Sequence, residues 1–240
     1  MPQIFHPAMN TVSRVSIFGA VFLVAAAVLI GGLVVRSSYV TEAGVIHDQP
    51  VPFSHQHHVT DCGIDCRYCH TSVEHSPFAG IPATEVCMNC HAYLYADSEM
   101  LEPVRESFRS GEPLVWTRVH DLPDFAYFDH SIHVSKGIGC ASCHGRVDQM
   151  PLMWRTETLD MEWCLDCHRH PAEHVRPREF VFRMESLEEL AETEEFRDYL
   201  QREYPPAEHP RLTYENPELL FNLREQLMKD YRIESETNCS

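Results

Sequence analysis

The chain has 240 residues and a formal net charge of −17 at pH 7. This acidic balance argues against a nucleic-acid-binding protein, because phosphate binding needs a basic face. Between residues 51 and 177 the sequence is rich in Cys, His and Pro, and it has too few periodic apolar positions to build an ordinary hydrophobic core.

The first predicted element is an uncharged apolar run at residues 15–35, flanked by Arg14 and Arg36. At about 1.5 Å per residue, this run is long enough to cross a bilayer core of about 30 Å. The alternative is a cleaved secretory signal with its cleavage site near the small residues 25–27, but the apolar part of such signals has typically about 7 to 15 residues. The run therefore predicts a retained transmembrane anchor helix.

Four Cys-x-x-Cys-His motifs follow, and they account for every Cys-x-x-Cys pair in the chain. Two thiols one helical turn apart can add to the two vinyl groups of haem c, while the adjoining imidazole lies under the iron. Zinc knuckles are the alternative, but they need no histidine directly after each pair. The motifs therefore predict four covalent haems, which would take the place of a core. Their cysteines are Cys66, Cys69, Cys87, Cys90, Cys140, Cys143, Cys164 and Cys167, and their histidines are His70, His91, His144 and His168.

A Phe-x-His-x-x-His segment precedes each pair of motifs, so the same block occurs twice in the sequence. Histidines at this spacing on a helix project from one face, and four of them match four irons that each need a sixth ligand. The repeat predicts two two-haem units, at residues 53–127 and 128–178. The predicted sixth ligands are His55, His58, His130 and His133, the second pair lying 75 residues after the first.

Other residues are alternatives for these ligand positions. A methionine would raise the potential of its haem, and Met150 and Met153 are the best candidates for that role, although buried packing is the more common use of such residues. Cys62 is assigned no role. Six further histidines are weaker ligand candidates: His57, His75, His120, His170, His174 and His209.

Residues 179–240 are predicted to form an acidic helical extension. Ser186 and Glu189 match a capping box at the start of one helix, and Asn216-Pro217 opens a second helix with a leucine stripe. We expect both to be docking helices. The acidic run at residues 185–203 is typical of a solvated helix face, and it could also steer a basic redox partner. The final Cys239-Ser240 has no partner cysteine: Cys239 is either a free thiol or the beginning of a fifth haem motif.

Residues 53–179 resemble the multihaem cytochrome c subunit of bacterial alternative complex III, a quinol-oxidising respiratory complex. The resemblance is carried by GIPATEVCMNCH at residues 80–91, by the long segment at residues 100–154 and by MEWCLDCHRHP at residues 161–171. It implies a mostly α and irregular fold of the class III cytochrome type. It also implies five haems, the fifth at a motif that begins with Cys239, and ligand pairs of His55 with His70 and of His130 with His144.

The function predicted from this resemblance is electron relay from quinol oxidation toward a periplasmic carrier or a terminal oxidase. One transmembrane helix cannot enclose a quinone pocket, so the expected partners are quinone-binding membrane subunits, an iron–sulfur protein and a monohaem cytochrome. The chain would then be an electron-transfer subunit rather than a stand-alone enzyme. The alternatives are a membrane-anchored quinol dehydrogenase of the NapC/NrfH type and a multihaem reductase with an open iron.

Haem c is attached outside the cytoplasm, and this fixes the predicted topology. We expect a single-pass protein of the cell inner membrane with its haem domain on the periplasmic side. Residues 1–14 would be a short cytoplasmic N-terminus, and residues 36–52 would link the anchor to the first two-haem unit.

Overall fold

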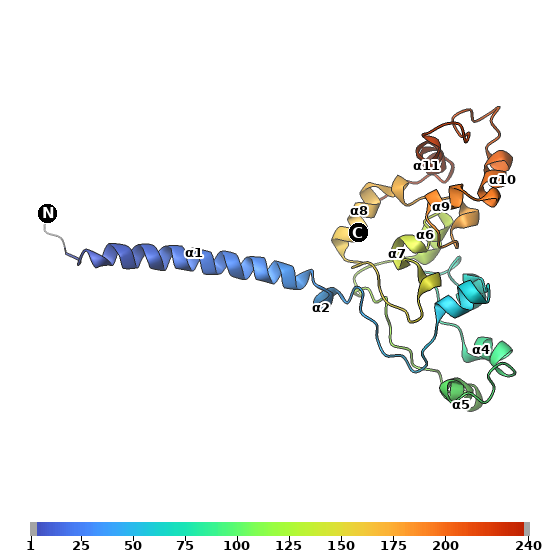
Figure 1. The fold of residues 1–240 in the computed structure, drawn as a ribbon, viewed down its shortest axis with the longest axis horizontal. Coiled ribbons are helices and arrows are strands. Elements are labelled where there is room, and N and C mark those ends of the chain that lie inside the picture. The colour runs from blue at the N-terminus through green and yellow to red at the C-terminus, as the bar shows by residue number, and fades with distance from the viewer. Residues whose placement is uncertain (1–3, 238–240) are drawn as a thin grey trace. The chain divides into compact units, whose positions relative to one another are not determined.

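The computed structural model describes residues 4–237, and the chain divides after Ala43 into two compact units. All regular elements in the described residues are helices. Two isolated β-bridges, Ile46 with Trp154 and Ile138 with Val175, are the extended pairings found there. The prediction of a helical and irregular chain with little sheet is therefore confirmed for residues 4–237 (Figure 1).

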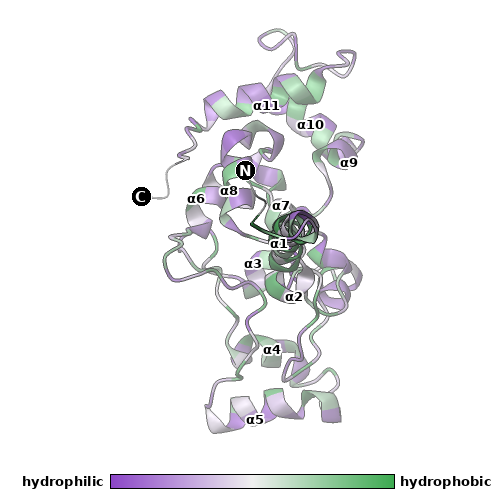
Figure 2. Cartoon of the chain, turned by 90° about the vertical axis from the view of Figure 1, so that its left-hand side faces the viewer, coloured by the Kyte–Doolittle hydropathy of each residue, from purple (hydrophilic) through white to green (hydrophobic). Residues whose placement is uncertain are grey.

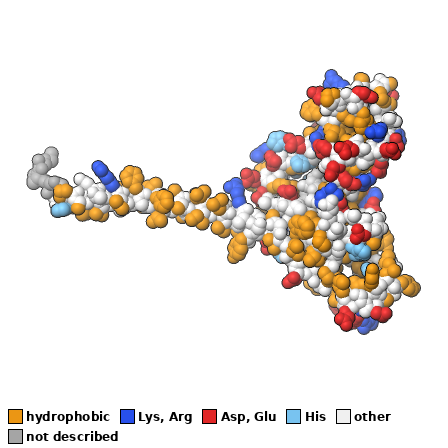
Figure 3. Space-filling model, viewed as in Figure 1, with side chains coloured by type: hydrophobic (Ala, Val, Ile, Leu, Met, Phe, Trp, Pro, Cys, Tyr) orange, Lys and Arg blue, Asp and Glu red, His pale blue; other side chains and the backbone are white. Residues whose placement is uncertain are grey.

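The first unit contains α1 (Ala8–Val35) and the short α2 (Ser38–Thr41). Among the described residues, α1 is the one helix that is long and apolar enough to cross a membrane. None of its residues is buried, and hydrophobic side chains cover it along its length (Figure 3). A helix that is apolar all round needs either a protein core or a lipid environment, and α1 has no core around it in this unit. Helix α1 begins at Ala8, seven residues before the predicted apolar run, so residues 8–14 extend the helix beyond that run.

The second unit places each Cys-x-x-Cys-His motif on or beside a short helix, with long irregular segments between the helices (Figure 1). Carboxylates begin three of its helices: Asp65 accepts from the Arg67 amide, Asp129 from the Ser131 amide and Asp160 from the Trp163 amide, each at 2.8 Å. The elements up to residue 180 are η1 (Gln56–Asp61, a π-helix), α3 (Cys66–Cys69), α4 (Thr84–His91), η2 (Glu99–Leu101), α5 (Glu102–Ser110), α6 (His130–Ser135), α7 (Ala141–His144), η3 (Val147–Gln149), α8 (Met161–Arg169), η4 (Pro171–Glu173) and η5 (Arg178–Phe180).

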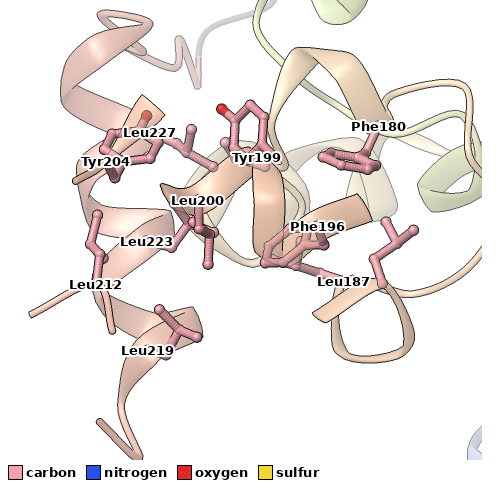
Figure 4. Packing of buried hydrophobic residues seen from close by; sticks show 12 residues of the cluster. Phe180, Leu187, Phe196, Tyr199, Leu200, Tyr204, Leu212, Leu219, Leu223 and Leu227 are labelled. Atoms are coloured by element: carbon pink, nitrogen blue, oxygen red, sulfur yellow. The ribbon is translucent and has the colours of Figure 1, made fainter. Parts of the chain in front are cut away.

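The hydrophobic core of the second unit lies mainly in its C-terminal part. The main buried cluster is built from α9 (Leu187–Ala191), α10 (Glu194–Glu203), α11 (Leu219–Asp230) and the residues that join them (Figure 4). Its fully enclosed members include Phe180, Phe196 and Leu223. Buried hydrophobic residues between 51 and 177 are few, as the sequence predicts: Val51, Val73, Val104, Val147, Met150 and Val175.

The helices of the extension begin as their local sequence requires. The capping box at α9 is present, since the Ser186 hydroxyl accepts from the Glu189 amide and the Glu189 carboxylate accepts from the Ser186 amide. Helix α11 begins at Leu219, because Asn216 accepts from the Glu218 amide and forms a turn ahead of it. Both α10 and α11 carry hydrophobic and hydrophilic residues (Figure 2).

Acidic side chains gather over α9 and α10 (Figure 3). Three of them are paired with arginines of other segments: Glu195 with Arg183 at 2.6 Å, Glu188 with Arg224 at 2.9 Å and Glu189 with Arg146 at 3.7 Å. Pairs this exposed add little to stability. The acidic run is therefore a solvated surface above the C-terminal core.

Candidate functional site

The motif cysteines are free thiols, and burial raises the pKa of most of them. The described cysteines form no disulfide bond. Burial raises the pKa of Cys140 and of Cys143 to about 12, and it also raises the pKa of Cys66, Cys69, Cys87 and Cys167. Within residues 4–237, no three His, Cys, Asp or Glu side chains converge as metal ligands.

Three of the four repeat histidines face a motif histidine across a narrow gap. The ring centroids are 6.2 Å apart for His58 and His91, and 6.3 Å apart for His130 and His144. The pair of His133 and His168 has the same separation as the first, 6.2 Å. Metal–nitrogen bonds of about 2.0 Å, with each coordinating nitrogen about 1.1 Å from its ring centroid, require a centroid separation of roughly 6.2 Å. Each pair is therefore spaced to hold one metal atom between its rings.

His55 completes the pattern beside His70. The Nδ1 atom of His55 is buried and has no hydrogen-bond partner. Burial, followed by the neighbouring positive charge of His70 when protonated, lowers the pKa of His55 to about 4. His55 is thus a neutral imidazole near the histidine of the first motif, and the first and second histidines of each segment lie near the first and second motifs of their own block.

Backbone carbonyls hold the other repeat histidines in the tautomer that a metal needs. Nδ1 of His58 lies 2.8 Å from the Ser54 carbonyl oxygen, and Nδ1 of His133 lies 2.7 Å from that of Asp129. His130 makes the equivalent contact with the Pro77 carbonyl at 2.7 Å. Because a carbonyl can only accept, Nδ1 must carry a proton, and in the neutral tautomer with this proton Nε2 is the free metal-binding nitrogen.

The motif histidines also donate from Nδ1 to a backbone carbonyl at three of the four sites. Nδ1 of His70 donates to the Gly80 carbonyl at 2.7 Å, and Nδ1 of His91 donates to the Leu94 carbonyl at 3.1 Å. Nδ1 of His168 donates to the Glu236 carbonyl at 2.6 Å. At His144 the partner is a side chain instead, since Nδ1 lies 3.2 Å from Nε2 of His120. Burial lowers the pKa of His144 to about 3 and that of His120 to about 4, so both rings are neutral at pH 7.

The phenylalanine of each repeated segment packs against both of its histidines in the same way. Phe53 stacks on His58 with a centroid distance of 4.4 Å and an interplanar angle of 26°, and it meets His55 edge-on at 4.9 Å. In the second block the corresponding distances for Phe128 are 4.6 Å to His133, again at 26°, and 4.7 Å to His130. The two blocks therefore share a Phe–His–His arrangement that fixes the direction of both imidazoles.

The remaining ligand candidates have other surroundings. Met150 is buried with Val147 and Met184, and Met153 is partly buried against the same cluster. His57 pairs with Asp61, His170 pairs with Asp166, and His209 meets Tyr204 edge-on. His75 is exposed, His174 is partly buried, and Cys62 is exposed with its sulfur 3.9 Å from Nε2 of His57. The predicted role of Cys239 lies outside the described residues.

Contacts between the motifs bring all four into one continuous group. The Asn89 amide of the second motif donates to the Tyr68 hydroxyl of the first at 3.2 Å. The first and third motifs meet at residues 181–182, where Cys140 donates from its amide to the Val181 carbonyl and the Cys66 thiol donates to the Phe182 carbonyl. The thiols of the third and fourth motifs, Cys143, Cys164 and Cys167, are close enough to raise the pKa of Cys143 further.

No family model matches the chain. Over 98 residues it is 39% identical to the multiheme cytochrome c subunit of menaquinone reductase from Nitratidesulfovibrio vulgaris. The match covers 40% of this chain and 46% of that relative, so the chain spans less than half the length of the curated protein it matches. This similarity supports the interpretation of the motifs as those of a multihaem cytochrome c.

Proposed function

We propose that this chain is an electron-transfer subunit of a membrane complex that acts on quinones, and that it binds haem c at its four motifs. The observation that carries the proposal is the spacing of the facing imidazoles, 6.2 to 6.3 Å at three sites, each beside a Cys-x-x-Cys pair. Haem bound there would supply reversible one-electron chemistry. The cysteines would anchor it, and the histidine pairs would be His55 with His70, His58 with His91, His130 with His144 and His133 with His168.

The four sites adjoin one another in the order second, first, third, fourth. Asn89 and Tyr68 join the second site to the first, residues 181–182 join the first to the third, and the thiols of Cys143 and Cys167 join the third to the fourth. The protein's contribution is to hold the imidazoles in their metal-binding tautomer. A relay is the activity that such a chain of sites supports best.

The resemblance to alternative complex III favours a more specific role, the relay of electrons from quinol oxidation to a periplasmic carrier or a terminal oxidase. The partners would then be quinone-binding membrane subunits, an iron–sulfur protein and a monohaem cytochrome. Helix α1 would anchor the chain in the inner membrane with the haem domain in the periplasm. A fifth haem would be bound at a motif that begins with Cys239.

The curated relative supports a second candidate with the opposite electron direction. That protein is named as a component of a menaquinone reductase. A chain of bis-histidine sites conducts in either direction, so the reaction depends on the partner subunits and on the potentials. In the second candidate this chain would deliver electrons to a quinone pool rather than receive them from it.

The test is to purify the full-length protein with its native partners and to measure covalent haem and quinone chemistry together. Mass spectrometry should show at least four attached haems. A quinol should reduce the haems of the complex. In the isolated chain, dithionite should reduce the haems but a quinol should not. Reduction of added menaquinone by pre-reduced complex, without haem reduction by quinol, would favour the second candidate. A polypeptide without covalent haem would overturn both, and quinol oxidation by the isolated chain would favour a stand-alone quinol dehydrogenase.

A further inference from the structure

The third haem site differs from the other three in what holds its motif histidine. Main-chain carbonyls accept from Nδ1 of His70, His91 and His168. Nδ1 of His144 instead lies 3.2 Å from Nε2 of His120, with the ring centroids 4.3 Å apart and the planes at 69°. The difference is not part of the repeat, because the residue 75 positions before His120 is Val45.

The segment that carries His120 is itself held in place. Three residues earlier, Thr117 forms a reciprocal pair with Gln49: its amide donates to the Gln49 side chain at 2.9 Å, and its carbonyl accepts from that side chain at 2.8 Å. The Thr117 hydroxyl also donates to the Asp48 carbonyl at 2.9 Å. The loop that places His120 beside His144 is therefore held by these hydrogen bonds, although the chain between α5 and α6 has no regular structure.

The direction of the hydrogen bond follows from the role of His144. If Nε2 of His144 binds iron, its Nδ1 carries the proton and donates, so Nε2 of His120 must accept. An imidazole nitrogen is a more basic acceptor than a carbonyl oxygen. A stronger acceptor gives the ligand more imidazolate character, which favours the oxidised iron and lowers the reduction potential.

We propose that His120 is a positioning residue for the third haem site, where it accepts from Nδ1 of His144, fixes the ring of His144 and lowers the potential of that haem. The inference rests on the proposed function, since it requires haem at the third motif. It goes beyond it by singling out one of four sites for electrochemical tuning through a residue outside the motifs and outside the repeat.

The test is a redox titration of the full-length holoprotein, followed spectroscopically, for wild type, His120→Leu and His120→Gln. Leu removes the acceptor, whereas Gln places an amide group near the former Nε2. We expect His120→Leu to keep the native haem count and a low-spin spectrum. The potential of one haem should rise, so at a fixed ambient potential its oxidised-to-reduced ratio should fall by about three- to tenfold. The ratios of the other haems should stay at their wild-type values. His120→Gln should give a smaller change in the same haem, and the exposed His75→Leu should give none.

The outcomes separate this inference from the proposed function. Wild-type protein without haem would overturn the proposed function. A normal haem count with superimposable titrations of wild type and His120→Leu would overturn the role of His120 alone. A high-spin haem in His120→Leu would also overturn it, because it would show that His120 is an axial ligand. If His120→Leu does not fold with its haems, the titration of His120→Gln is the test. A titration curve of His120→Gln identical to that of wild type would then overturn the proposal.

Discussion

The two histidines of each Phe-x-His-x-x-His segment lie near the histidines of the two motifs of their own block, in sequence order. The two segments adopt different local helices, since Gln56–Asp61 is a π-helix and His130–Ser135 is an α-helix. Their phenylalanines nevertheless stack on the second histidine at the same angle, 26°. The aromatic contact, rather than the helix type, is therefore the shared cause of the imidazole directions.

Replacing a repeat histidine should open one iron without detaching its haem. In His58→Ala we expect one haem to become high spin, because Nε2 of His58 is no longer opposite His91, while the covalent haem count stays unchanged because the thioethers remain. Optical and paramagnetic resonance spectra of the oxidised protein would measure this.

The neighbouring His57→Ala is the matched control, because His57 is exposed and pairs with Asp61. It should leave the spectra unchanged. A fully low-spin His58→Ala variant, or a high-spin haem in the control, would remove His58 from the ligand set.

The motifs and the repeat could be read from the sequence because both are local patterns with a fixed spacing. The sequence did not place His58 and His133, because the target of a side chain depends on the path of the irregular segments between the motifs. His120 was only one of six weak candidates. It lies 24 residues from His144, has no counterpart in the first block, and contacts Nδ1 of His144, whereas Nε2 of that ring would hold the iron.

At the scale of elements, the acidic extension is more than a pair of docking helices. Leu219, Leu223 and Leu227 follow a helical stripe in the sequence, and all three are buried. Periodicity reveals the apolar face of a helix but not what covers it. The structure shows that the cover is supplied by α9, α10 and residues such as Phe180 (Figure 4).

Truncating the centre of this cluster should destabilise the protein and leave the haem ligands intact. Leu223 is fully buried, so Leu223→Ala removes contacts and leaves a cavity, at a cost of about 2–5 kcal/mol. Thermal unfolding followed by circular dichroism should show a clear loss of stability in this variant.

Phe221→Ala, on the same helix but 64% exposed, should change stability by less than about 1 kcal/mol. Equal stability of the two variants would mean that the cluster does not act as the core.

Helix α1 should be separable from haem attachment. Deletion of residues 15–35, with export of the remainder by a cleavable signal, removes the apolar surface that a bilayer would cover. We expect the haems to remain attached and membrane association to weaken, as measured by haem content in soluble and membrane fractions. Loss of haem in the exported protein would mean that α1 has a role in maturation.

At the scale of the whole molecule, the net charge of −17 should affect the choice of redox partner. From about 0.01 M to about 1 M salt, the Debye length falls from about 30 Å to about 3 Å. Electron exchange with a basic cytochrome should slow by about tenfold or more over this range, because screening removes the steering. Stopped-flow measurements of this electron-exchange rate at several salt concentrations would test the prediction. An uncharged oxidant should react at a nearly constant rate, and equal salt dependence of the two would argue against steering.

The uneven distribution of buried side chains has a consequence for biogenesis. The ordinary core is encoded mainly after residue 179, so in the proposed export route all four Cys-x-x-Cys-His motifs would leave the translocon before that core can form. Residues 51–177 contribute few buried hydrophobic side chains with which the nascent chain could collapse, so their thiols would stay accessible for haem attachment. Late folding of the C-terminal helices would then close the protein around cofactors that are already in place.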